Sequence, residues 1–147
     1  MILTKKKKYS DSQKLAILCA QAAQDKLAEN TVILDLHKID IASSNFIVVC
    51  DCKSTVQVKS VADNILNNIV DHDLPKPKLE GMETAEWVIL DFFDVVVHIF
   101  ISELRSYYKL EKLWADSEFY VVNDDAELEE TSYSDLKIEI ENAIDEE

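Results

Sequence analysis

The sequence contains a single glycine, Gly81, and only two prolines among its 147 residues. Phosphate-binding loops such as G-x-G-x-x-G and G-x-x-x-x-G-K-[ST] need several glycines, because only glycine lets the backbone come close to a phosphate group. Neither motif can be formed with one glycine, so the composition argues against nucleotide chemistry. We therefore expect no bound cofactor.

Cysteine is also scarce, and its spacing does not match a metal site. The three residues, Cys19, Cys50 and Cys52, are an odd number without the paired C-x-x-C spacing of zinc sites. We interpret them as reduced structural thiols and predict no metal site, with metal or redox chemistry as the alternative. The sequence has no apolar run of about 18 residues and no signal-peptide pattern, so we expect a soluble, cytoplasmic protein without membrane contact.

Positive charge is in short supply towards the end of the chain. Residues 1–118 carry 14 Lys and Arg against 18 Asp and Glu, whereas residues 119–147 carry 1 against 11, for a net charge of −14. Binding to phosphate needs clustered Lys and Arg, so we expect no specific nucleic-acid binding and favour a basic protein partner. The basic run at residues 5–8, within an arm of residues 1–10, is interpreted as solubilising, with contact to RNA phosphate as the alternative.

The apolar residues, 48% of the chain, are enough for the core of one domain. Their periodicity predicts an α/β domain over residues 11–117 with an element order of about αββαβββα. The predicted helices cover residues 11–29, 55–71 and 103–115. The predicted strands cover residues 32–36, 45–50, 78–80, 86–91 and 95–101.

Residues 118–147 are expected to form a separate acidic tail. The acidic stretch at residues 124–130 is typical of a solvated linker. Residues 134–145 place Leu136, Ile140 and Ile144 on one helical face and predict a short helix, although Leu136, Ile138 and Ile140 also fit the alternation of a strand. The tail either docks this thin apolar edge on the domain or remains mobile.

Three ionisable residues of the predicted hairpin at residues 86–101 are the candidates for catalysis. Alternation places His98 on the same strand face as Val96 and Phe100. Asp91 and Asp94 flank the turn, but their spacing differs from the D-x-D pair that directs two carboxylates at one cation. We favour a structural or interface role for His98 and predict no enzyme activity; a nucleotidyltransferase-like reaction is the enzyme alternative.

Aromatic residues near this hairpin are typical of an interface. Trp87 begins a strand, and Tyr107 and Tyr108 are about 100° apart on a helix, so they are not expected to face the core together. Exposed Tyr and Trp beside Arg105 and Glu111 have the composition of a protein–protein hot spot. We interpret Trp87 and Tyr108 as interface residues, with core packing as the alternative.

Two motifs carry a family resemblance. Residues 80–100 read E-G-M-E-T-A-E-W-V-I-L-D-F-F-D-V-V-V-H-I-F, and residues 105–114 read R-S-Y-Y-K-L-E-K-L-W. Together they resemble the signature of the Iojap/ribosomal silencing factor family, and the similarity runs from about Gln13 to Trp114. The residues that match the motif, and for which the resemblance implies partner binding, are Trp87, Asp91, His98, Arg105, Tyr108, Glu111 and Leu113.

The resemblance implies an α/β domain similar to the nucleotidyltransferase fold, with a mixed sheet flanked by helices and no catalytic apparatus. It also implies a homodimer that binds the large ribosomal subunit at ribosomal protein fourteen. Occupying that face would block subunit joining and repress translation. Assembly of the large subunit through the same contact is the alternative.

The sequence departs from the family pattern at three places. Asn45 replaces a usual acidic residue, and residues 50–53 replace a turn rich in threonine and glycine. Phe93 replaces the glycine of the hairpin turn, where a type I′ turn requires positive φ. We therefore expect a turn of another type or a strained one. The acidic tail lies outside the resemblance.

Overall fold

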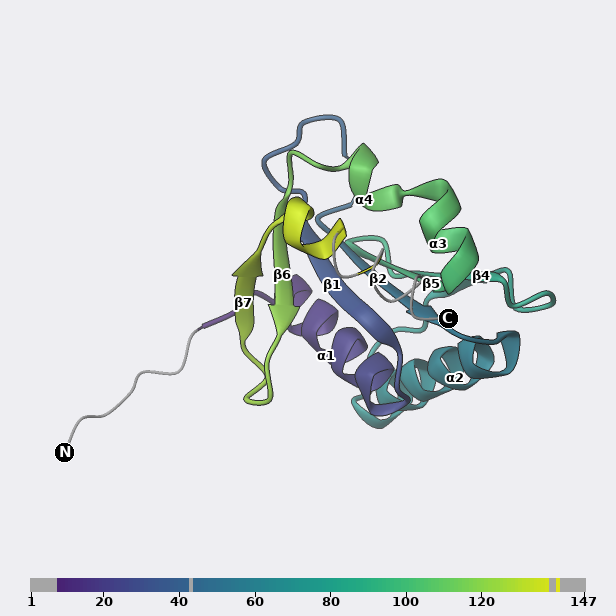
Figure 1. Cartoon of the computed structure of the whole chain (residues 1–147). Coiled ribbons are helices and arrows are strands. Elements are labelled where there is room, and N and C mark those ends of the chain that lie inside the picture. The colour runs from purple at the N-terminus through teal and green to yellow at the C-terminus, as the bar shows by residue number, and fades with distance from the viewer. Residues whose placement is uncertain (1–7, 43, 138–139, 141–147) are drawn as a thin grey trace.

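The computed structural model describes residues 8–42, 44–137 and 140 of the chain. Seven strands form one mixed sheet in the order β3-β4-β5-β2-β1-β6-β7, and helices lie on both of its faces (Figure 1). The helices are α1 (Asp11–Asp25), α2 (Thr55–Asp71), α3 (Ser102–Tyr108) and α4 (Leu110–Leu113). The strands are β1 (Glu29–Asp35), β2 (Phe46–Cys52), β3 (Lys78–Glu80), β4 (Trp87–Asp91), β5 (Val95–Ile101), β6 (Glu118–Val122) and β7 (Leu128–Thr131). The predicted α/β fold with a mixed sheet flanked by helices is confirmed.

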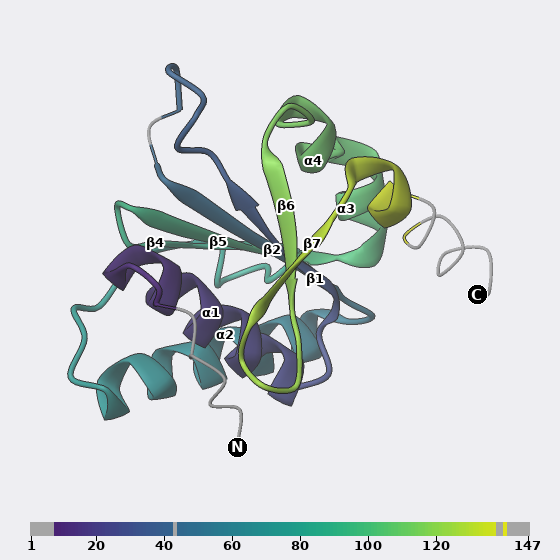
Figure 2. The same ribbon diagram turned by 90° about the vertical axis from the view of Figure 1, so that its left-hand side faces the viewer.

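The two long helices cover one face of the sheet. Figure 2 shows α1 and α2 beneath the strands and α3 and α4 above them. Ser10 begins α1 with a capping box that it shares with Gln13, and the Ser54 side chain accepts from the backbone N–H of Gln57 at the start of α2. Such caps satisfy backbone N–H groups that have no partner within the helix. The apolar stripes of both helices are thereby held against the sheet and form the larger of two buried clusters.

The centre of the sheet is the parallel pair of β2 and β5, while the other neighbouring strands pair antiparallel. Along β5 the side chains alternate as predicted. Val95 and Val97 are fully buried in the cluster between the sheet and α1 and α2, whereas Val96 and His98 are half-buried on the opposite face. The open side of β5 is therefore the side that carries His98.

The sheet continues beyond residue 117, where the sequence predicts the domain to end. β6 pairs with β1 and β7 pairs with β6, so the predicted solvated linker at residues 124–130 is instead part of a β-hairpin. Phe119 and Leu128 are buried, while Glu129 and Glu130 are exposed on the edge strand. Acidic residues are compatible with an edge strand because their side chains face water. The acidic composition therefore led to the prediction of a linker where the chain forms two short strands.

The chain after β7 returns to the domain. Residues 133–137 are helical, and Leu136 packs in the second buried cluster on the α3 side of the sheet. Of the two alternatives predicted for the tail, docking on the domain or remaining mobile, the described residues show docking. The remainder of the predicted helix at residues 134–145, apart from Ile140, lies outside the described residues, as does the basic run at residues 5–8 apart from Lys8.

The predicted helix over residues 103–115 is interrupted. Lys109 has a left-handed backbone with φ 51° and separates α3 from α4. The break explains how Arg105 and Glu111 meet. Six residues apart on a continuous helix they would point about 120° away from each other, yet Arg105 Nε donates to Glu111 Oε1 over 2.7 Å. A buried ion pair therefore overrides the local helical preference.

Candidate partner-binding site

Five aromatic side chains gather where β4 and β5 meet α3. The rings of Trp87 and Tyr108 have centroids 4.9 Å apart, and Trp87 stacks on Phe100 at 4.7 Å. Tyr107 lies edge-on to Tyr108 at 5.1 Å. Trp87 Nε1 donates a hydrogen bond of 3.0 Å to His98 Nδ1. We call Trp87, His98, Tyr107 and Tyr108 the aromatic surface.

The aromatic surface is open to solvent. Tyr107 is 77% exposed and Tyr108 51% exposed, and Trp87 and His98 are half-buried. The predicted contact residue Leu113 is 71% exposed on α4. Aromatic side chains presented beside apolar ones are typical of the buried centre of a protein–protein interface. The structure thus brings Trp87, His98 and Tyr108 together from three separate elements.

His98 acts in this site as a neutral ring. Burial lowers its pKa to about 4, and the nearby Asp91 carboxylate opposes this shift only in part. Because Nδ1 accepts the indole N–H of Trp87, the ring proton of the neutral form is placed on Nε2. The imidazole therefore orients Trp87 without adding charge to the surface.

The only glycine of the chain lies next to the backbone of Trp87. Gly81 has φ 87°, and a Cβ atom at this position would overlap the carbonyl oxygen of Trp87. The carbonyl of Gly81 also accepts the backbone N–H of Ala85, a buried residue with φ 55°. Glycine is required here because the loop before β4 must pass directly over the first residue of that strand.

Two predicted contact residues are buried and serve the fold instead. Arg105 is 1% exposed and Glu111 4% exposed. Arg105 Nη1 contacts Asp51 Oδ1 at 2.8 Å and the backbone oxygen of Asn30 at 2.7 Å, while its Nε binds Glu111. A buried guanidinium needs such partners because its desolvation is costly. The network ties α3 and α4 to β1 and β2, so neither side chain is part of the aromatic surface.

The candidate catalytic residues do not converge among the described residues. His98 is hydrogen-bonded to Trp87 rather than to a carboxylate. Asp91 and Asp94 are both exposed, and the Asp94 backbone oxygen accepts from the N–H groups of Asn45 and Phe46. Within the described ranges, no group of three His, Cys, Asp or Glu side chains is arranged to hold a metal ion. A general base would need a convergent partner, so this geometry gives no support to a reaction.

The hairpin turn between β4 and β5 is strained, as the departure at Phe93 suggested. Phe93 has φ 77°, an uncommon conformation for a bulky residue. The N–H of Asp94 donates to the Phe92 oxygen, which closes a three-residue γ-turn, and the Phe93 N–H donates to the Asp91 carboxylate over 2.8 Å. Asp91 therefore has a local structural use at the end of β4.

Sequence reasoning missed one residue beside the aromatic surface. Ile89 pairs directly with His98 across β4 and β5, next to Val96, which alternation had already placed on this face. Ile89 and Val96 are both half-buried. Alternation from Trp87 would have found Ile89, because residues two apart on a strand share a face.

Fold and site together define an α/β domain whose half-open sheet face presents aromatic side chains to solvent. A family model described as ribosomal silencing factor during starvation matches residues 9–145. The ribosomal silencing factor RsfS of Bacillus subtilis is 39% identical over 100 residues, covering 68% of this chain and 84% of the relative. The protein of the same name from Halalkalibacterium halodurans is 38% identical over 106 residues, covering 72% and 90%. The chain therefore belongs to the ribosomal silencing factor family.

A solved structure agrees with this assignment. The crystal structure of a protein from Chromobacterium violaceum superposes with a TM-score of 0.67 at 30% identity, covering 71% of this chain and 87% of that one. The family is named for a regulatory role and not for a reaction. No helix among the described residues is long and apolar enough to cross a membrane.

Proposed function

We propose that this protein represses translation by binding the large ribosomal subunit at ribosomal protein fourteen and blocking the approach of the small subunit. The observation that carries the proposal is the exposed aromatic surface beside α3. Family membership supports a ribosomal partner, and the aromatic surface is the patch whose composition best suits a hot spot. Silencing then needs only occupancy of a surface, which is consistent with candidate catalytic residues that do not converge.

The charge around the aromatic surface supports a basic protein partner. Glu86 precedes Trp87 and is exposed, Glu103 is exposed on α3, and Asp91 is exposed at the end of β4. Acidic side chains around an aromatic centre steer and orient a partner of opposite charge. They would repel bare RNA phosphate, so the contact we propose is with a ribosomal protein.

We also propose that the protein is a homodimer. β3 is an edge of the sheet, and its three residues are all exposed. An unpaired edge can extend its hydrogen bonding into a second copy. Light scattering at micromolar concentration is expected to give twice the mass of the 16.8 kDa chain; the mass of one chain would contradict this part of the proposal.

Co-sedimentation with isolated large subunits tests the proposed contact. Truncating a buried aromatic anchor costs about 2–4 kcal/mol, so Trp87→Ala and Tyr108→Ala should each weaken binding roughly thirtyfold or more. Val56→Ala is the matched control, because Val56 is also exposed but lies on α2, which covers the opposite face. If both aromatic variants fold and co-sediment like the wild type, the contact lies elsewhere.

Subunit association separates silencing from assembly. Purified large and small subunits are mixed with the protein at low magnesium, and the fraction of joined ribosomes is measured. The proposal predicts fewer joined ribosomes with the wild type and no effect with Tyr108→Ala. Binding to the large subunit without any effect on joining would favour the assembly role.

A further inference from the structure

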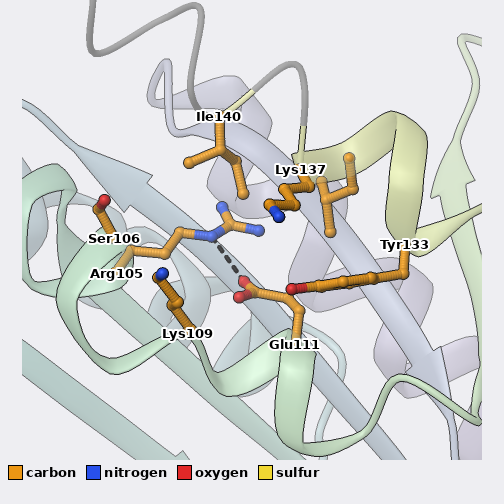
Figure 3. A pocket seen from close by; sticks show the side chains of 8 residues that line it. Arg105, Ser106, Lys109, Glu111, Tyr133, Lys137 and Ile140 are labelled. Atoms are coloured by element: carbon orange, nitrogen blue, oxygen red, sulfur yellow. Dashed lines mark hydrogen bonds and ion pairs between the residues drawn. The ribbon is translucent and has the colours of Figure 1, made fainter.

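A pocket separates α3 and α4 from the chain after β7. Its walls come from α3, α4 and the side chains of Tyr133, Leu136, Lys137 and Ile140, and it contains about 390 Å³ of space including its open mouth (Figure 3). Tyr133, Leu136 and Ile140 supply an apolar wall, and Arg105, Lys109 and Lys137 supply cationic groups.

Arg105 leaves one donor without a partner in this pocket. Its Nε binds Glu111 and its Nη1 binds Asp51 and the backbone of Asn30. Its Nη2 is buried and has no hydrogen-bond partner among the described residues. An unpaired buried donor on a charged group is costly. An acceptor from outside the chain would remove this cost.

The charges around the pocket favour an anionic acceptor. Figure 3 shows Lys137 directed toward the guanidinium of Arg105. Among the described residues that line the pocket or pair with Arg105, there are three cationic side chains, Arg105, Lys109 and Lys137, and two carboxylates, those of Glu111 and Asp51, which leaves an excess of one positive charge. A single negative charge would balance this excess, whereas a dianion would reverse it.

We propose that the pocket binds a small monocarboxylate with an apolar tail. The carboxylate accepts from Nη2 of Arg105, with the ammonium groups of Lys109 and Lys137 nearby. The tail packs against Leu136, Ile140 and the ring of Tyr133. Charge-assisted hydrogen bonds to a carboxylate are stronger than those to a neutral carbonyl, and the apolar wall selects against small hydrophilic anions.

The test is an NMR titration of the full-length protein with isovalerate, following the Arg105 Nε–H signal and the backbone amides of α3. Isovaleramide serves as the neutral isostere, acetate as the carboxylate without a tail, and inorganic phosphate as a hydrophilic anion. We expect saturable shifts centred on Arg105 with isovalerate, and binding at least about tenfold weaker with the other three probes.

Substitution of the exposed lysines Lys109 and Lys137 tests ligand binding without disrupting the buried ion pairs of Arg105. Lys109→Gln combined with Lys137→Gln is expected to weaken isovalerate binding about tenfold while leaving the amide spectrum of the β-strands unchanged. Lys112→Gln is the control for the loss of a nearby surface charge, since it removes one positive charge from α4 at a residue that does not line the pocket.

Three results would overturn the proposal. The first is a lack of saturable shifts with isovalerate at tens of millimolar. The second is equal affinity for isovaleramide, which would remove the role of the negative charge. The third is a double lysine variant that binds like Lys112→Gln. None of these measurements involves the ribosome, so the outcome is independent of the proposed function.

Discussion

The two faces of the sheet are built in different ways. One face is covered by α1 and α2, which have 15 and 17 residues and pack a continuous apolar cluster. The other is covered by α3 and α4, which have seven and four residues, and by the short helical segment after β7. This second face combines a buried ion-pair network with exposed aromatic rings.

The difference separates stability from recognition. Short helices leave part of β4 and β5 open, so Trp87, Ile89 and His98 keep contact with solvent. The Arg105 network then ties α3 to β1 and β2, beside the smaller of the two apolar clusters. We therefore expect the loss of strands or of the buried ion pairs to destabilise the fold. Changes to the exposed aromatic rings should leave its stability nearly unchanged.

The largest expected effect comes from deleting residues 118–147. The deletion removes β6 and β7 and the buried side chains Phe119, Val122, Leu128 and Leu136. Burial of each large apolar side chain contributes about 1.5–3 kcal/mol, and the sum approaches the whole stability of a typical domain. We expect the truncated chain to lose cooperative thermal unfolding in circular dichroism.

A charge-only variant sharpens this test. Asp124→Asn with Asp125→Asn removes two exposed charges from the β6–β7 turn and keeps both strands. It should change the free energy of unfolding by less than about 0.5 kcal/mol. A truncated chain as stable as this variant would mean that the strand pair contributes nothing to the sheet.

The next largest effect is expected at Arg105. Arg105→Ala leaves Asp51 and Glu111 buried without their cation, which typically costs about 3–5 kcal/mol. Urea denaturation measures the loss. Lys109→Ala, in the adjacent turn but exposed, is the control and should cost less than about 1 kcal/mol. Equal losses for the two variants would show that the network does not fix α3.

These two regions also show where sequence reasoning works and where it fails. The alternation along residues 95–101 is a local pattern, and it placed His98 on the correct face of the sheet. The burial of Arg105 and Glu111 depends on a helix break at Lys109, which a contact with β1 and β2 stabilises. Local periodicity carries no information about that contact.

The prediction for the acidic end of the chain was wrong for a different reason. Composition suggested a solvated tail, because eleven acidic residues outweigh one lysine after residue 118. Only a few apolar side chains, such as Phe119 and Leu136, are needed to attach a strand pair and a helical turn to an existing sheet. Charge counts therefore overestimated the tendency of this segment to stay in solvent.

A pH effect of intermediate size is expected from His98. Its folded pKa of about 4 lies below the ordinary value of 6.5, so the unfolded chain binds more protons between these pH values. Stability should therefore fall as the pH drops from about 6.5 towards 4, by an amount on the order of 2 kcal/mol. Protonation of Nδ1 would also break its bond to Trp87.

The pH dependence can be isolated by substitution. His98→Gln should flatten the stability profile between pH 4 and 6.5 in urea titrations, whereas His72→Gln, at an exposed position, should leave the slope unchanged. A wild-type profile that is flat in this window, or a slope that persists in His98→Gln, would argue against the neutral imidazole.

The smallest expected effect is a gain. Phe93→Gly relieves the positive φ of the γ-turn and should stabilise the protein by about 0.5 kcal/mol, because the backbone relief exceeds the entropy that glycine loses on folding. Phe93→Ala keeps the strain and is the control. Differential scanning calorimetry would show a higher Tm for the glycine variant alone; a lower one would mean that the exposed phenyl ring stabilises the turn.

The aromatic surface as the ribosome contact is the central claim, and site-specific cross-linking tests it most directly. A photoreactive phenylalanine analogue replaces Tyr107, which is 77% exposed and lies next to Tyr108. The control carries the same analogue at Val56 on α2. After irradiation with large subunits, we expect the Tyr107 position to cross-link to ribosomal protein fourteen and the Val56 position to give no such product. A Tyr107 product with another component, or equal products from both positions, would contradict the account.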